Sequence, residues 1–188
     1  MTVVLDTQGH ENRLMVRSRL VRILQDAHAG ELAAAFAYRS HARSLRDEAE
    51  RAEVRRIEQA EWHHRAMVAV LLDELSASPR KPRELLMGAI GRFFGALCFV
   101  SGWFAPMYAA GRLEAMNVGQ YLDARDAALH LGLVSVADRL EVMRVEEVRH
   151  EQWFGDQIRH HPLLRPTRRV LGWSPPPALP VRPRRADD

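Results

Sequence analysis

The sequence contains two copies of one pattern, an isolated glutamate followed about thirty residues later by a Glu-x-x-His segment. The members are Glu31, Glu61 and His64 in the first copy, and Glu114, Glu147 and His150 in the second. A glutamate and a histidine three positions apart lie on one face of a helix, so both can approach the same metal ion. Carboxylate and imidazole donors suit iron or manganese, and the absence of thiolates argues against structural zinc. The pattern therefore indicates a pair of metal ions, with all six residues as ligands and catalytic groups.

Long helices are needed to position these residues, and the sequence predicts them. Residues 13–76 contain one glycine and no proline, and their apolar residues recur at three- and four-residue steps. This predicts one helix through residues 20–45 and a second from about residue 50 to the breaker cluster at 76–79. A third helical stretch begins at Pro82 and is kinked or ended by Pro106. Two more helices are expected at about 107–130 and 135–159, and no segment shows the period of two that a strand requires.

Each candidate ligand replaces an apolar residue in the row that faces the predicted core. Burying an unpaired carboxylate costs several kcal/mol, and four close together also repel one another. A domain that is stable by only about 5–15 kcal/mol cannot hold four such anions without compensation. Two divalent cations would balance the four negative charges.

The spacing between ligands indicates how the helices are connected. Intervals of 30 and 33 residues within the two copies suit two antiparallel helical hairpins. The fifty residues from His64 to Glu114 leave room for a long crossover connection. We therefore expect an all-α fold, a ferritin-like four-helix bundle with an extra apolar crossover helix. This domain should occupy residues 13–160, followed by a Pro/Arg-rich extended tail at 161–188.

Composition narrows the class of protein further. A chain of 188 residues with 47% hydrophobic residues suits one globular domain. The single cysteine, Cys98, excludes an intramolecular disulfide, and the N-terminus lacks the apolar core of a signal peptide, so we expect a cytoplasmic protein. The net charge is only +3, and the basic residues are nearly all arginine, so no nucleic-acid partner is expected.

The residues around these ligands resemble the di-iron demethoxyubiquinone hydroxylases of ubiquinone biosynthesis, a ferritin-like family. Gly30-Glu31 followed by Tyr38, the order Glu, Glu-x-x-His, Glu, Glu-x-x-His, and Lys81-Pro82 before a long apolar stretch carry the resemblance across residues 13–160. It implies two iron ions and an O₂-dependent monooxygenase that hydroxylates a lipophilic quinone-like ring. The third ligand helix departs from the family pattern, because Asp123 takes the position of the family's glutamate. We prefer Glu114, which lies on the face shared with Ala110, Val118 and Tyr121.

Two other classes of protein would have the same six residues in their interior. A ferritin-like iron-oxidising or iron-storage protein would use the di-iron site only to oxidise Fe²⁺, and should assemble into a large hollow cage. A bundle that binds no metal is the third alternative.

The apolar stretch 93–111 bears on the partners of the protein. Its nineteen residues carry no charge, but Gly95, Gly102 and Pro106 interrupt it, and a membrane span would separate Glu114 from the other ligands. Two alternatives stay open: a buried crossover helix, or an interfacial surface that receives a lipid-soluble substrate at the inner face of the membrane. The expected partners are O₂ and a hydrophobic small molecule, and a homodimer is left open.

The tail after Pro162 is rich in proline and arginine around Trp173. This composition is typical of an extended, poorly ordered arm, either a solvated appendage or a segment that contacts a membrane or a partner.

Overall fold

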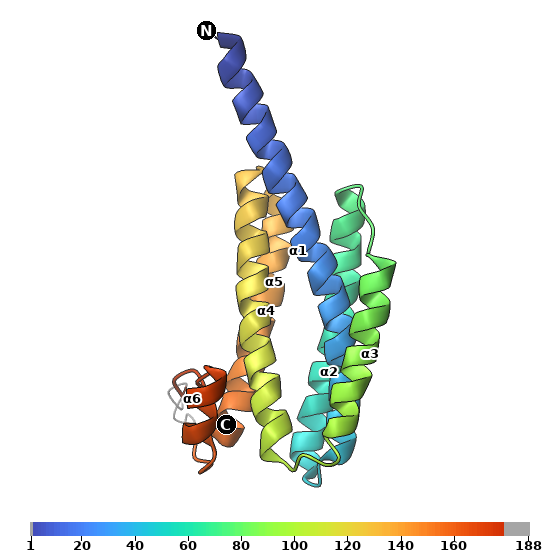
Figure 1. The fold of residues 1–188 in the computed structure, drawn as a ribbon, viewed down its shortest axis with the longest axis vertical. Coiled ribbons are helices and arrows are strands. Elements are labelled where there is room, and N and C mark those ends of the chain that lie inside the picture. The colour runs from blue at the N-terminus through green and yellow to red at the C-terminus, as the bar shows by residue number, and fades with distance from the viewer. Residues whose placement is uncertain (1, 179–188) are drawn as a thin grey trace, which may run out of the picture.

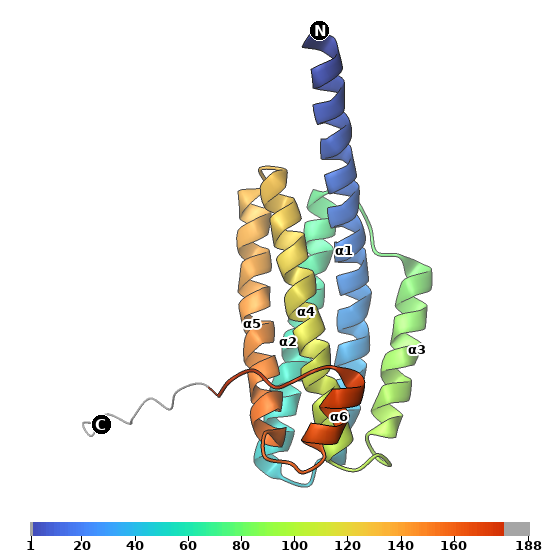
Figure 2. The same ribbon diagram turned by 60° about the vertical axis from the view of Figure 1, so that its left-hand side comes forward.

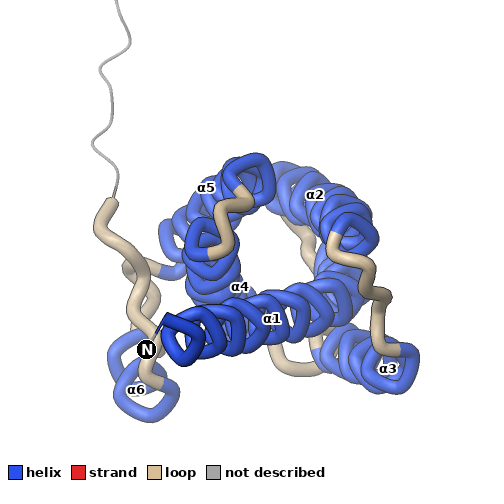
Figure 3. Tube along the Cα trace, turned by 90° about the horizontal axis from the view of Figure 1, so that it is seen from above, coloured by secondary structure: helices blue, strands red, loops and turns tan. Residues whose placement is uncertain are grey.

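The computed structural model describes residues 2–178, with side chains described from residue 9 onward. Within this range the chain is helical and has no strand, which confirms the expected fold class. The helices are α1 (Thr2–Ser44), α2 (Glu48–Glu74), α3 (Lys81–Leu97), α4 (Phe104–His130), α5 (Val134–Ile158) and α6 (Leu164–Leu171). Helices α1, α2, α5 and α4 surround a common centre, and α3 and α6 lie outside them (Figure 3). The first turns of α1 project beyond the other helices (Figure 1).

Local signals set the helix ends. The Asp47 side chain accepts a hydrogen bond from the Glu50 amide and caps the start of α2. Gly132, at a φ of +75°, makes the tight turn between α4 and α5. Pro106 lies in the first turn of α4, where a missing amide costs no hydrogen bond. The prediction that Pro106 kinks or ends the preceding helix was therefore wrong, because α3 already ends at Leu97.

The apolar core of the bundle consists of two layers. One layer includes Leu20, Leu71 and Leu140, and the other includes Ile57 and Phe154. On every bundle helix, the residues of one layer precede the candidate ligands and those of the other follow them. The ligand positions thus fall at the same height of the bundle, between the two layers.

Helix α3 packs against α1 through a row of glycines. Gly88, Gly91 and Gly95 are its buried residues, and a Cβ at Gly91 would lie 2.6 Å from the Cα of Ala33. A Cβ at Gly95 would lie 2.8 Å from that of Ser40. The two helix backbones can approach this closely only because these positions lack a side chain.

We expect Gly91→Ala to destabilise the protein by about 1–3 kcal/mol, because the new methyl group would meet the α1 backbone. Gly119→Ala is the matched control: this α4 glycine is exposed and has nothing within 4 Å of an added Cβ. The control should stabilise the helix by about 0.5–1 kcal/mol. Urea unfolding of both variants measures the difference, and equal midpoints would contradict the glycine contact.

The outer face of α3 is apolar and exposed. The side chains of Phe93 and Phe94 on α3 are 60% and 52% exposed, and those of Phe99 and Val100 in the link that follows are 57% and 80% exposed. The apolar stretch 93–111 is therefore divided: residues 98–103 form the link to α4, and most of residues 104–111 are buried in the bundle. A buried crossover helix was the wrong alternative for residues 93–103, because the glycine row occupies the packed face and leaves the large side chains outside. No helix in the described part of the chain is long and apolar enough to span a membrane.

The predicted extended tail is structured in its first half. Residues 164–171 form α6, and Trp173 is 7% exposed. Its indole fills the space above Gly111, and its Nε1 donates to Glu151 over 2.9 Å. The prediction of an extended, solvated arm was wrong here, because glycines on α4 and α5 leave room for tail residues to pack against the bundle. The composition of the tail does not reveal this contact. Residues 179–188 lie outside the described residues.

Candidate metal centre

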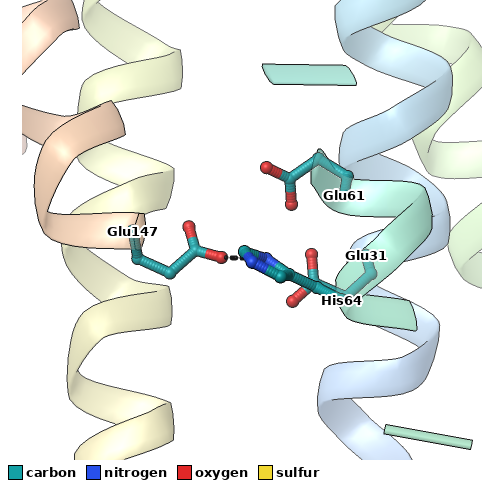
Figure 4. A group of neighbouring side chains, drawn as sticks. All are labelled: Glu31, Glu61, His64 and Glu147. Atoms are coloured by element: carbon teal, nitrogen blue, oxygen red, sulfur yellow. Dashed lines mark ion pairs between the residues drawn. The ribbon is translucent and has the colours of Figure 1, made fainter. Parts of the chain in front are cut away.

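All six candidate residues come together in the middle of the bundle. Glu31 lies on α1, Glu61 and His64 on α2, Glu114 on α4, and Glu147 and His150 on α5. Each is at most 2% exposed. Figure 4 shows four of them converging from three helices toward one centre.

These side chains form two overlapping groups. Glu31, Glu61, His64 and Glu147 offer atoms within 4.8 Å of one another, and so do Glu61, Glu114, Glu147 and His150. Glu61 and Glu147 belong to both groups. The two groups could hold two adjacent cations, with these two carboxylates available to both and one further glutamate and one histidine for each.

Many polar atoms of the cluster have no hydrogen-bond partner in the described structure. They are one oxygen each of Glu31 and Glu114, both oxygens of Glu61 and Glu147, and Nδ1 of His64 and His150. The His64 Nδ1 lies 2.8 Å from Glu147 Oε1, but without the geometry of a hydrogen bond (Figure 4). Buried polar atoms without partners are costly, and atoms that point at a shared centre are what a metal ion requires. The residues therefore fit a pair of bound cations.

The electrostatics of the cluster also favour cations. Burial raises the pKa of Glu31, and it raises the pKa values of Glu61 and Glu114 well above their ordinary range. Burial alone would lower the pKa of His64, but the close contact with the negatively charged Glu147 carboxylate outweighs burial and raises it to about 9. Without a metal the site thus retains protons, and bound cations would replace them.

Two tyrosines support the isolated glutamates in a reciprocal way. Tyr38 of α1 donates to Glu114 of α4, and Tyr121 of α4 donates to Glu31 of α1. Each tyrosine follows the glutamate of its own helix by seven residues. These hydrogen bonds orient one oxygen of each glutamate and leave the other directed to the cluster. The spacing Glu-x₆-Tyr in both halves of the chain was a signal for the Tyr121 role, which the sequence reasoning missed.

A second residue that the sequence reasoning missed is Glu146. Its Oε2 lies 2.7 Å from Nε2 of His64, so it fixes the orientation of that ring and directs Nδ1 inward. Sequence periodicity could not reveal this contact, because Glu146 reaches across from α5 to α2. Glu58, in contrast, pairs with Arg39 and accepts from Trp62.

The structure also distinguishes between the two candidates on the third ligand helix. Glu114 is fully buried in the cluster. The Asp123 side chain is 63% exposed and lies 3.4 Å from Arg19. The structure therefore brings Glu114 to the other candidate ligands and keeps Asp123 on the surface.

The fold and the cluster together define a ferritin-like helical bundle whose interior can hold metal ions. The family model described as ubiquinone biosynthesis protein COQ7 matches residues 18–153, and the chain belongs to this family. This confirms the resemblance stated from the sequence and supports an enzymatic, hydroxylase role in ubiquinone biosynthesis. All six clustered residues lie within the matched range, whereas α6 lies beyond it. No curated protein sequence matches the chain.

Proposed function

We propose that the protein is a di-iron, O₂-dependent monooxygenase that hydroxylates a lipophilic quinone-like ring. The observation that carries this proposal is the buried cluster of four glutamates and two histidines, with inward-facing atoms that lack partners, inside the region matched by the family. Membership of a ubiquinone-biosynthesis family supports a quinone as the substrate class.

The residues of the cluster have distinct proposed roles. Glu31 and His64 would hold one iron, Glu114 and His150 the other, and Glu61 and Glu147 would help to hold both. When bound, the iron pair would supply O₂ activation for ring hydroxylation. Tyr38 and Tyr121 would keep the terminal glutamates in place. The two apolar core layers exclude water above and below the cluster.

The exposed face of α3 supports a membrane as the source of the substrate. Leu85, Leu86, Phe93 and Phe94 are each more than half exposed on this helix. An apolar face of this kind suits the boundary between lipid headgroups and acyl chains. We therefore propose that the protein associates peripherally with a membrane surface through α3 and the residues that follow it.

Product formation tests the proposal directly. The iron-loaded protein, given a reductant, O₂ and a demethoxylated quinone in detergent, should yield the hydroxylated quinone, with oxygen from ¹⁸O₂ in the product. An iron-storage function would give no quinone product, and would instead give ferric mineral inside a large hollow oligomer. Particle mass measured under the same conditions separates the two functions.

A further inference from the structure

A basic hollow lies at the junction of α5 and α6, outside the region that the family model matches. Its volume is about 530 Å³. The polar side chains in its wall are Arg159, His160, His161, Arg165 and Arg168. No acidic residue of the described chain contributes to this wall.

The positive charge of the hollow is only partly neutralised. Arg159 pairs with Asp156 over 2.5 Å and also donates to the carbonyl of Pro176. Arg165 and Arg168 have no carboxylate within ion-pair distance in the part of the chain whose side chains are described. Residues 157–178 contain four arginines and no acidic residue, although the whole chain carries a net charge of only +3. The hollow therefore has the charge to attract an anion.

Exposed apolar side chains lie on and next to α6, the helix that contributes to the wall of the hollow. Leu163, just before α6, and Val170 and Leu171 at its end are 52%, 81% and 49% exposed. Leu171 follows Arg168 by three positions, so these two exposed side chains lie on the same face of this short helix, whereas Leu163 and Val170 lie on its other side. A small soluble anion would make no favourable contact with this apolar surface.

The hollow also adjoins the apolar link between α3 and α4. The His161 ring stacks on Phe104 with centroids 4.4 Å apart, and it lies 6.0 Å from the ring of Trp103. Trp103 ends the exposed link that contains Phe99 and Val100. Helices α3 and α6 lie outside the four-helix bundle on opposite flanks of α1 (Figures 1 and 3), and both reach its lower part (Figure 2). The ring contacts of His161 thus place the hollow beside the apolar link that follows α3.

We propose that the basic hollow binds the phosphate of an anionic phospholipid headgroup, while α6 and residues 98–103 lie at the membrane surface around it. Guanidinium groups pair with phosphate through paired hydrogen bonds, and basic residues beside an apolar surface attract anionic lipid. This inference rests on the proposed function, because a quinone hydroxylase takes its substrate from a membrane. It assigns headgroup recognition to a segment that the family match does not include.

Vesicle binding by the full-length, iron-loaded protein tests the inference without any turnover. The protein should cosediment far better with phosphatidylcholine vesicles that contain phosphatidylglycerol than with pure phosphatidylcholine vesicles. Arg165→Gln/Arg168→Gln should weaken binding to the anionic vesicles by roughly twentyfold, since each arginine near such a surface contributes about a fivefold factor. Binding to pure phosphatidylcholine should stay the same.

The control is Arg55→Gln/Arg149→Gln, which removes the same charge from exposed arginines on α2 and α5. It should reduce binding to the anionic vesicles by less than about twofold, since net charge alone acts weakly at a distance. Equal effects of the two double variants would overturn the site.

Displacement by millimolar inorganic phosphate at constant ionic strength would assign the hollow to a soluble phosphate and overturn the lipid assignment. Iron content and circular dichroism show that each variant is folded. Because no hydroxylation is measured, failure here is distinct from failure of the proposed function.

Discussion

Glu147→Gln should remove both metal ions, whereas His150→Ala should leave about one. The reason is that Glu147 belongs to both ligand groups and His150 to only one. Loss of a ligand should lower metal affinity by at least about a hundredfold, since even the partners that orient ligands are worth 10–100-fold. Product formation should fall by a similar factor or more in both variants. Iron per chain, measured by elemental analysis after gel filtration, should decrease from about two to near zero and near one.

Two further variants make this prediction specific. Glu114→Gln should lower the iron content like His150→Ala, because both residues belong to the same group. Asp123→Asn should leave the iron content and the rate unchanged, since its side chain is exposed and pairs with Arg19. The ligand assignment fails if Asp123→Asn loses iron while Glu114→Gln retains it.

The metal-free protein should become less stable between about pH 7 and pH 9. The pKa values of Glu61 and Glu114 lie well above their ordinary range because of burial. Burial would lower the pKa of His64, but the negative charge of the adjacent Glu147 carboxylate outweighs burial and raises this pKa to about 9. In this window the folded state binds more protons than the unfolded state, so the free energy of unfolding falls as pH rises. Burial lowers the pKa of His41 to about 4, so this residue makes the folded state less stable only as pH falls below 6.5, outside this window.

Bound metal should reverse this dependence on pH. A ligand that binds only the folded state adds about 4 kcal/mol of stability at a thousandfold excess over its dissociation constant. Metal binding becomes stronger as pH rises, because the carboxylates and imidazoles must lose their protons to coordinate. Urea unfolding at pH 7 and pH 9, with chelator or with Mn²⁺, measures both effects. Identical midpoints for the metal-free protein at the two pH values would show that the cluster carries no excess protons.

The bundle and its cluster could be predicted from the sequence because helical periodicity places Glu31, Glu61 and Glu147 in apolar rows. Each row records which face of a helix is buried, and four rows with polar members at matching positions define one centre. The exposure of Phe93 and Phe94 could not be predicted from the apolar sequence alone, because it does not show whether another segment covers these side chains. The spacing of Gly88, Gly91 and Gly95 was the signal for the packed face of α3.

Other features depend on contacts between distant segments. Trp173 is buried because Gly111 leaves room for its indole, and no local pattern links these two residues. Glu146 supports His64 from a different helix. Such pairings follow from how the hairpins meet, so they became visible only when the helices were placed in space.

The division of the core into two apolar layers has a consequence for cooperativity. On all four bundle helices the buried glutamates and histidines interrupt the apolar rows at the same height. No continuous row of apolar contacts therefore joins the two layers. The bound cations would hold the two apolar layers together. Backbone amides beside the cluster should therefore exchange with deuterium much faster once the metal is removed, while those deep in each layer keep their protection.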